Sequence, residues 1–402
     1  MVMRFINEVD INEKRLLCRF DFNVPLDENL TIADDRRIRA ALPTINYALD
    51  EHAKIIIVSH LGRPKGKVVE SLRLTPVARR LSRFLNKEII LERDCVGEDI
   101  SYLVNNMNPG SIVFLENLRF HKGETENDDN FARTLASYAD VYVDDAFGNA
   151  HRSHASNVGI CKYVETCCAG FLMKRELNYF KNAMENPYRP LVAIIGGSKV
   201  SDKLAALINL VKIADKIIVG GGMAFTFMKS LGVEVGSSLV DDSQLEIAQK
   251  ILRTVNESGI KFYLPVDCVI AQKIDKAAVT KIVPVQEMIP NWMGLDIGPA
   301  SIRLFSEVIS NARTVIWNGP LGVFEIDAFS RGTYAMVHRV ADSHALTIVG
   351  GGDTDVAIHR AGETDNISYI STGGGAFLEL LEGKPLPAIQ ALEDCDDRET
   401  GN

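Results

Sequence analysis

Basic and amide side chains follow several short apolar runs in the first half of the sequence. They occur in the motifs RFDFNVP, DDRRIRA, SHLGRPKG, NLRFHKGE and DAFGNAHRSH. The groups that these motifs supply are Asp21, Asn23, Arg36, His60, Arg63, Arg119 and Arg152. A guanidinium forks onto carboxylate or phosphate oxygens, so arginines gathered at one place would bind an anion. One such arginine is more often a solvated surface residue, but four in equivalent positions favour an anion-binding site.

The apolar runs in the second half of the sequence end in glycine instead. The motifs are GGSK, VGGGM, NGPLGVFE, VGGGDT and STGGGA. Glycine has no Cβ, so backbone N–H groups can approach a ligand closely, and the N-terminus of a following helix adds partial positive charge. A single Gly-Gly pair could be only a tight turn. Five glycine motifs in one half of the chain predict a cradle for nucleotide phosphates.

Charged residues beside these glycines could complete a nucleotide site. Lys199 and Lys203 would share one face of a helix that begins near Ser198 and would point toward phosphates, although Lys203 could instead be a surface lysine. Asp353 could cap a helix or hold Mg²⁺, which typically takes one or two carboxylates plus substrate oxygens. Glu325 could accept hydrogen bonds from ribose hydroxyls or be a solvated carboxylate.

Strand-like apolar runs alternate with helix-like segments along the whole chain. This pattern predicts parallel sheets covered by helices on both faces, with ligands beyond the carboxyl ends of the strands. Between the two halves, residues 172–184 suit a helix that Pro187 and Pro190 end. The predicted fold class is α/β, with two doubly wound Rossmann-like lobes of parallel strands joined by an interdomain helix. The predicted domains are 1–170, 171–186 for the helix, and 187–385.

Composition narrows the class of protein. The 402 residues suffice for about two domains, and 46% hydrophobic with 24% charged residues is typical of a soluble globular protein. The net charge of −9 disfavours binding to duplex nucleic acid. No secretory signal is apparent, and the longest uncharged run, 217–228, is too short to span a membrane. The seven cysteines lack a CxxC motif and are expected to be reduced thiols in a cytoplasmic protein.

The motifs together resemble the phosphoglycerate kinase family. The segments that carry the resemblance are RFDFNVP, SHLGRPKG, LENLRFHKGE, DDAFGNAHRSHAS, GGSKVSDK, WNGPLGVFE, GGGDT and STGGGAFLELLEGK. They occur in the family's order over nearly the whole chain. The resemblance implies a monomeric, cytoplasmic enzyme of glycolysis and gluconeogenesis that transfers phosphate between 1,3-bisphosphoglycerate and Mg-ADP, giving 3-phosphoglycerate and Mg-ATP. It also implies that 1–170 bind 3-phosphoglycerate, that 386–402 pack back onto them, and that 187–385 bind nucleotide.

The resemblance also implies roles for single residues. Those of the 3-phosphoglycerate site are Asp21, Asn23, Arg36, His60, Arg63, Arg119 and Arg152. Those of the nucleotide site are Lys203, Gly294, Glu325, Gly351, Gly352, Asp353 and Thr354. Arg36 would reach the transferring phosphoryl group, and Asp353 would be associated with the metal. Lys199, Gly373 and Gly374, with Gly375 beside them, would approach the phosphates when the lobes close.

Three positions depart from the family pattern. The family usually has Val at Phe20, Asn at Asp144 and a small residue at Asn149. The extra carboxylate of Asp144 could weaken substrate binding, or it could be paired by His151 or Arg152. None of the implied ligand positions is lost.

The expected chemistry needs no general base, because the acceptor carboxylate is already ionised at pH 7. Catalysis would be alignment and electrostatic stabilisation of a loose phosphoryl transition state, with closure of the lobes excluding water. The segments expected to absorb this motion are 172–184 and the STGGG motif.

Alternative functions are another carboxylate kinase, of the acetate or aspartate type, and a catalytically silent phospho-ligand sensor. The sequence has no GxGxxG fingerprint, which disfavours an NAD-dependent dehydrogenase. It also has no GxxxxGK[ST] motif, which disfavours a Walker-type nucleotide site.

Overall fold

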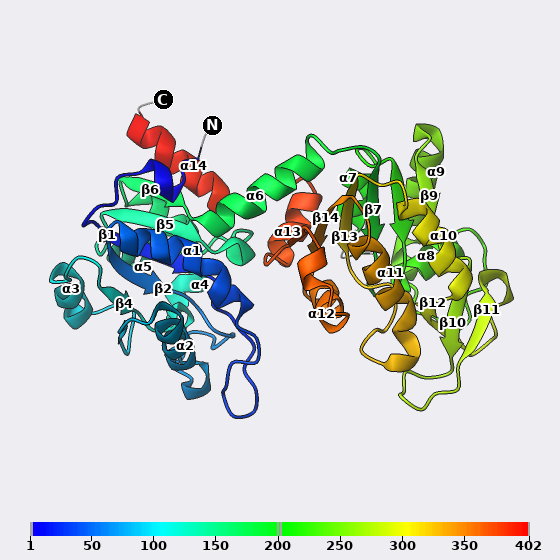
Figure 1. Ribbon diagram of the computed structural model, residues 1–402, viewed down its shortest axis with the longest axis horizontal. Helices are drawn as coiled ribbons and strands as arrows, with labels where there is room; N and C mark the ends of the chain where they lie inside the picture. The colour runs from blue at the N-terminus through cyan, green and yellow to red at the C-terminus, as the bar shows by residue number, and fades with distance from the viewer. Residues whose placement is uncertain (1–2, 199–200, 202, 401–402) are drawn as a thin grey trace. The chain divides into compact units, whose positions relative to one another are not determined.

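Two parallel sheets organise the chain into two units (Figure 1). The computed structural model describes residues 3–198, 201 and 203–400. Unit 1 comprises Met1–Leu177 with Pro385–Asn402, and unit 2 comprises Asn178–Lys384. The parallel pairing follows from the sequence pattern, since the strands are nearly continuous runs of buried apolar residues separated by helices.

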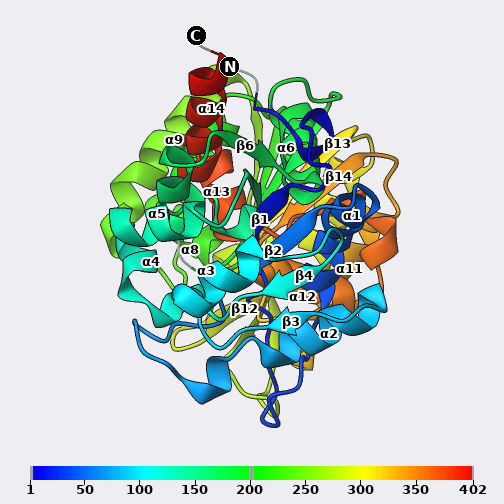
Figure 2. The same cartoon turned by 90° about the vertical axis from the view of Figure 1, so that its left-hand side faces the viewer.

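The sheet of unit 1 has six parallel strands in the order β3-β4-β2-β1-β5-β6. The strands are β1 Arg15–Phe20, β2 Lys54–Val58, β3 Ile90–Leu91, β4 Ile112–Phe114, β5 Val141–Asp145 and β6 Thr166–Ala169. The helices of this unit are α1 Arg36–Asp50, α2 Thr75–Leu85, α3 Glu98–Asn105, α4 Lys122–Glu126, α5 Asp129–Ala136 and α14 Pro387–Thr400. Figure 2 shows α1 and α2 on one side of the sheet and α4, α5 and α14 on the other. The carboxyl ends of the strands are therefore left for the loops that carry the polar motifs.

The C-terminal helix α14 packs against β6. Its start is fixed by a hydrogen bond from the Ala388 N–H to the Ala150 carbonyl, 3.1 Å. Cys395 and Asp396 of this helix are buried.

The expectation of seven reduced cysteines is also wrong for two of them. Cys167 of β6 and Cys395 of α14 form a disulfide, whereas Cys18, Cys95, Cys161, Cys168 and Cys268 are free and buried. The paired cysteines are 228 residues apart in the sequence, and only the folding of the C-terminal segment onto unit 1 brings them together. Their spacing therefore gave no sign of the bond.

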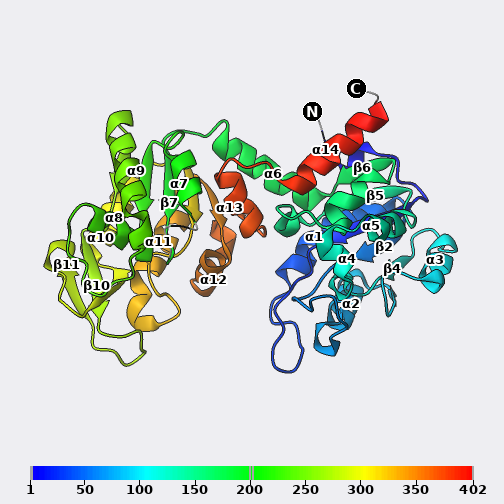
Figure 3. The same ribbon diagram turned by 180° about the vertical axis from the view of Figure 1, so that it is seen from behind.

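Unit 2 holds a second six-stranded parallel sheet, in the order β15-β14-β13-β7-β8-β9, and a three-stranded antiparallel sheet, β11-β10-β12. Its strands are β7 Leu191–Ile195, β8 Lys216–Val219, β9 Lys261–Tyr263, β10 Asp267–Ala271, β11 Lys281–Pro284, β12 Met293–Ile297, β13 Thr314–Asn318, β14 Leu346–Gly350 and β15 Tyr369–Ile370. Its helices are α7 Leu204–Leu210, α8 Gly222–Ser230, α9 Leu245–Ser258, α10 Pro299–Ile309, α11 Arg331–Ala341, α12 Gly352–Arg360 and α13 Gly375–Leu381. Figures 1 and 3, seen from opposite sides, show α10 and α11 over one face of the parallel sheet and α7 and α8 over the other. The antiparallel sheet was not predicted.

Helix α6, Phe171–Met184, connects the units, and the division falls within it, between Leu177 and Asn178. Its start is held in unit 1, where the Asp145 carboxylate at the end of β5 accepts from the Met173 N–H, 2.9 Å, and from the Thr44 hydroxyl, 2.6 Å. Its later part packs in unit 2, where Tyr179 stacks on Tyr369 with ring centroids 4.3 Å apart. Each part of the helix is thus anchored in its own unit.

Candidate active site

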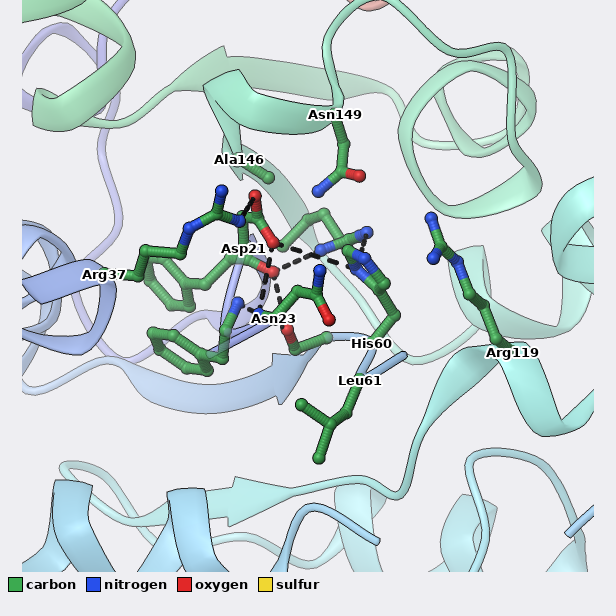
Figure 4. Close-up of polar contacts among 12 residues, drawn as sticks. Asp21, Asn23, Arg37, His60, Leu61, Arg119, Ala146 and Asn149 are labelled. Carbon is green, nitrogen blue, oxygen red and sulfur yellow. Dashed lines mark hydrogen bonds and ion pairs between the residues drawn. The ribbon is translucent and has the colours of Figure 1, made fainter. Parts of the chain in front are cut away.

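Four of the predicted anion-site residues gather at the carboxyl ends of the strands of unit 1. Asp21 and Asn23 follow β1, His60 follows β2, and Arg119 lies in the short helix Leu118–Phe120 after β4. Figure 4 shows these side chains in one cluster, together with Arg37 of α1. The parallel sheet explains the gathering, because all its strands deliver their following loops to the same edge.

The acidic and imidazole groups of the cluster are held by arginines. Arg37 donates to the Asp21 carboxylate, and Arg19 Nη2 lies 3.2 Å from His60 Nδ1. Burial, and then the positive charges of Arg19, Arg119 and other arginines, holds the pKa of His60 well below its usual range. His60 is therefore neutral at pH 7 and can donate one N–H to a ligand. Arg19 was not predicted, although a charged residue within a buried strand is a recognisable signal.

Arg119 has the strongest requirement for a ligand. It is 5% exposed, and only its Nη1 has an acceptor, the Gly62 carbonyl at 2.8 Å. Its Nε and Nη2 have no acceptor among the residues that the structure describes. Burial, followed by repulsion from Arg19 and Arg152, lowers its pKa to about 10, so it is still charged at pH 7. A buried guanidinium with two unused donors fits a multidentate anion.

The other predicted residues of unit 1 take different positions. Arg152 is near enough to lower the pKa of both His60 and Arg119, and its Nε donates to His151 Nε2 at 3.2 Å. Arg36 is the first residue of α1 and donates to the Asp34 carboxylate, with Nε at 2.8 Å. Arg63 is exposed and takes no part in the hydrogen bonds described above for the cluster.

Unit 2 contains a cavity of about 460 Å³. Gly294, Glu325 and Asp353, all predicted for the nucleotide site, line it together with Gly197, Gly221 and Gly222. Apolar side chains form much of the remaining wall: Phe225, Leu239, Met293, Leu321 and Val323. An apolar slot with a few polar groups is typical of a small-molecule site, and a flat base would fit between these side chains. Asp296 also lines it and was not predicted.

A lysine and a glycine loop lie side by side near this cavity. Lys203 Nζ donates to the carbonyls of Gly196, at 2.6 Å, and Asn318, at 3.1 Å. A Cβ on Gly319 would lie 2.1 Å from the same Nζ, and Gly319 has a φ of +97°. Glycine is therefore needed there both for the backbone conformation and for the lysine. The Gly319 N–H is held by the Thr354 hydroxyl at 2.7 Å.

The lysine is not placed as predicted. Helix α7 begins at Leu204 with Lys203 as its N-cap, so Lys203 precedes the helix that was expected to begin near Ser198. Lys199 lies outside the described residues. From its place before the first turn of α7, Lys203 reaches carbonyls at the ends of β7 and β13.

The remaining predicted residues lie at the starts of two helices. Gly351 is the N-cap of α12, followed by Gly352, Asp353 and Thr354, and Gly374 is the N-cap of α13, preceded by Gly373. Thr354 is fully buried and holds Gly319, whereas Asp353 is exposed. Asp353 therefore presents a carboxylate to the cavity.

Comparison with known proteins decides the family. A family model described as phosphoglycerate kinase matches residues 6–384. The phosphoglycerate kinase of Geotalea uraniireducens is 59% identical over 395 residues, which cover 98% of this chain and 99% of the relative. The chain belongs to the phosphoglycerate kinase family. The phosphoglycerate kinase of Aquifex aeolicus is 54% identical over 389 residues, covering 97% of this chain and 98% of that one.

Solved structures of phosphoglycerate kinases have the same fold. The one from Coxiella burnetii is 42% identical, with a TM-score of 0.89 over 98% of this chain and 99% of that one. The one from Pyrococcus horikoshii OT3 is 28% identical, with a TM-score of 0.84 over 99% of this chain and 100% of that one. The activity is therefore that of a phosphoglycerate kinase, a phosphotransferase with a carboxyl acceptor. The expected fold class and family are confirmed.

Asp144 is a buried carboxylate on β5. Its Oδ1 accepts from the Ala146 N–H at 3.0 Å, and its Oδ2 has no partner among the described residues. Burial raises its pKa to about 6, and the nearby charge of Arg19, opposite it on β1, works in the other direction. No described hydrogen bond joins Asp144 to His151 or Arg152, the two partners considered from the sequence.

Replacing Asp144 with asparagine should stabilise the folded protein at pH 7.5 by about 1–3 kcal/mol. The folded-state pKa lies above the unfolded value, so wild-type stability falls as pH rises from about 4 to about 6 and stays lowered above that range. At pH 4 the folded carboxyl is neutral, and the two proteins should differ little. Urea unfolding at both pH values measures this, with the exposed Asp342→Asn as control. An equal change at both pH values would contradict the burial cost.

Proposed function

We propose that the chain transfers a phosphoryl group reversibly between 1,3-bisphosphoglycerate with ADP and 3-phosphoglycerate with ATP. In this proposal 3-phosphoglycerate binds to the cluster of unit 1, and the nucleotide binds in the cavity of unit 2. The main support is Arg119, a buried guanidinium with two donors that no described residue satisfies. A substrate phosphate would supply the missing acceptors and the compensating charge.

Unit 1 supplies groups for each part of 3-phosphoglycerate. Arg63, Arg119 and Arg152 bind the phosphate, and neutral His60 donates one hydrogen bond. The Asp21 carboxylate accepts from the substrate hydroxyl. Asn23 shapes the loop as well, because its Oδ1 accepts from the Gly62 N–H at 2.8 Å. Arg36 extends from the start of α1 toward the transferring phosphoryl group.

Unit 2 binds the nucleotide along its glycine motifs. Gly294 and the apolar wall accommodate the base, and Glu325 accepts hydrogen bonds from the ribose. Lys203 and the backbone N–H groups of Gly351, Gly352 and Thr354 hold phosphates at the start of α12. Gly373, Gly374 and Lys199 complete the phosphate contacts in the reacting complex.

The exposed carboxylate of Asp353 fits Mg²⁺, because this ion typically takes one or two protein carboxylates plus phosphate oxygens. It lines the cavity and has no hydrogen-bond partner among the described residues. When bound with the nucleotide, Mg²⁺ would neutralise phosphate charge. Asp353 would hold it at the phosphate end of the cavity.

The reaction requires alignment and charge stabilisation rather than proton transfer. The acceptor carboxylate of 3-phosphoglycerate is ionised at pH 7 and can attack directly. Arg36 and Lys203 then stabilise the charge on the equatorial oxygens of a loose transition state. Each unit holds one substrate, so the two must meet in a closed complex that excludes water, with α6 and the STGGG motif as hinges.

The proposal also covers the cellular location and the oligomeric state of the enzyme. We place it in the cytoplasm as a monomer, in line with the family. The described residues contain no helix with the length and apolar character needed to cross a membrane.

A coupled assay with ATP, Mg²⁺ and 3-phosphoglycerate tests the proposed function. We expect rapid turnover with 3-phosphoglycerate, at least about 100-fold less with acetate or aspartate because neither supplies a phosphate for Arg119, and none after EDTA. Preference for acetate or aspartate would indicate another carboxylate kinase. Binding of both substrates without turnover would indicate a phospho-ligand sensor.

A further inference from the structure

Asn149 holds a buried amide whose hydrogen-bonding capacity the fold does not use. It is 3% exposed and ends the short helix Phe147–Asn149 after β5. Its Nδ2 has no acceptor among the residues that the structure describes. Figure 4 shows this amide turned toward the cluster that contains Asp21, His60 and Arg119.

The backbone of Asn149, in contrast, is fully bonded. Its N–H donates to the Ala146 carbonyl at 2.8 Å, and its carbonyl accepts from the Arg152 N–H at 2.9 Å and from Asn157 Nδ2 at 3.1 Å. The position of the residue is therefore fixed without its side chain. A small residue at this position would serve the fold equally well and would leave no buried donor unmet.

An unmet buried donor is destabilising, so its retention points to a partner that arrives with the ligand. The surroundings specify that partner. Arg119 also has buried donors, Nε and Nη2, that lack an acceptor among the described residues. Arg19 and Arg152 add positive charge near it. The missing acceptor is thus an anion with several oxygens.

We propose that Asn149 Nδ2 donates a hydrogen bond to the phosphate of 3-phosphoglycerate, the same phosphate that Arg119 binds. This inference rests on the proposed function. Nε and Nη2 of Arg119 form a fork that engages two oxygens. A phosphate monoester retains a third terminal oxygen for the amide, whereas the fork would engage both oxygens of a carboxylate. Asn149 is then an additional substrate-binding residue in this chain.

The test is titration calorimetry of the full chain with Asn149→Ala. The affinity for 3-phosphoglycerate should fall by about 10- to 100-fold, and inorganic phosphate should compete with it correspondingly less well. The affinity for ATP should stay within about twofold of wild type. Asn149→Leu, which is similar in size and carries no donor, should show the same loss of affinity if the alanine variant folds poorly. In the steady state KM for 3-phosphoglycerate should rise far more than kcat falls.

A second readout separates ligand binding from a structural role. Without ligand, Asn149→Ala should melt at or above the wild-type temperature, because the unmet donor is gone. The matched control is Asn157→Ala, which removes a buried amide that donates to the carbonyls of Asn149, 3.1 Å, and Arg152, 2.8 Å. That variant should lower the ligand-free Tm by about 3 °C or more.

Three results would overturn the inference. They are unchanged affinity for 3-phosphoglycerate in Asn149→Ala, a loss of ligand-free stability like that of Asn157→Ala, and weakened binding of D-glycerate with phosphate competition intact. The last would assign the amide to the carboxylate end of the substrate. Failure of wild type itself to bind 3-phosphoglycerate would instead refute the proposed function, so the two failures are distinguishable.

Discussion

Replacing Arg36 with alanine should lower kcat by about 1,000-fold or more while the affinity for ATP stays within about twofold of wild type. A positioned arginine on a transferring phosphoryl group contributes about 10³–10⁵ to the rate because the charge it stabilises develops only in the transition state. Arg36 belongs to unit 1, whereas the proposed nucleotide cavity is lined by residues of unit 2 alone. The loss should therefore appear in turnover and not in nucleotide binding, with both measured on the same preparation.

The result should not be a folding defect, because the Arg36 side chain is 36% exposed and its ion pair with Asp34 is also partly exposed, at 32% for the Asp34 side chain. Arg39, on the next turn of α1, provides the control, with a side chain 59% exposed and an ion pair to Asp35. Arg39→Ala should turn over like wild type. Loss of ATP binding in Arg36→Ala, or equal losses of turnover in both variants, would mean that Arg36 does not act on the phosphoryl group.

The sequence predicted the parts of the site that depend on the ends of strands. In a parallel sheet the residue after each strand is at the ligand-binding edge, so Asp21, His60 and Arg119 could be grouped from their positions in the sequence alone. The same reasoning brought Glu325 and Asp353 to one cavity. The positions of these residues could be predicted because they depend on local pattern and on one topological rule, whereas their roles stay predictions.

Features that depend on contacts between distant segments were not predicted. The disulfide between Cys167 and Cys395 depends on where α14 docks, and no local pattern encodes that. Asp296 carries no motif, yet its buried carboxylate accepts from the Gly332 N–H, 2.6 Å away, and burial raises its pKa to about 7. Similarly, a sequence identifies Asn149 as an asparagine but does not show that its amide lacks an acceptor. That fact follows only from the position of every neighbouring oxygen.

Lys203→Ala should lower kcat by about 100-fold and weaken ATP binding by about 10-fold, leaving 3-phosphoglycerate affinity unchanged. The variant removes a charge from the proposed phosphate end of the cavity and leaves the carbonyls of Gly196 and Asn318 without their shared donor. Steady-state kinetics and ATP titration measure both effects. The exposed Lys212→Ala should behave like wild type. Wild-type kinetics in Lys203→Ala would remove the residue from the mechanism.

Gly319→Ala tests the same site without replacing Lys203. The added methyl group would lie 2.1 Å from Lys203 Nζ and 2.2 Å from the Gly196 carbonyl oxygen, so both the ammonium group and the carbonyl that holds it must move. The turnover defect should therefore resemble that of Lys203→Ala. The backbone strain of alanine at positive φ is controlled by Gly362→Ala, where φ is +75° and the space around the new Cβ is open. If Gly319→Ala loses turnover and Gly362→Ala loses only stability, then catalysis requires the local arrangement of the Lys203 ammonium group and the Gly196 carbonyl that accepts from it. Equal loss of turnover in both would attribute the effect to backbone strain instead.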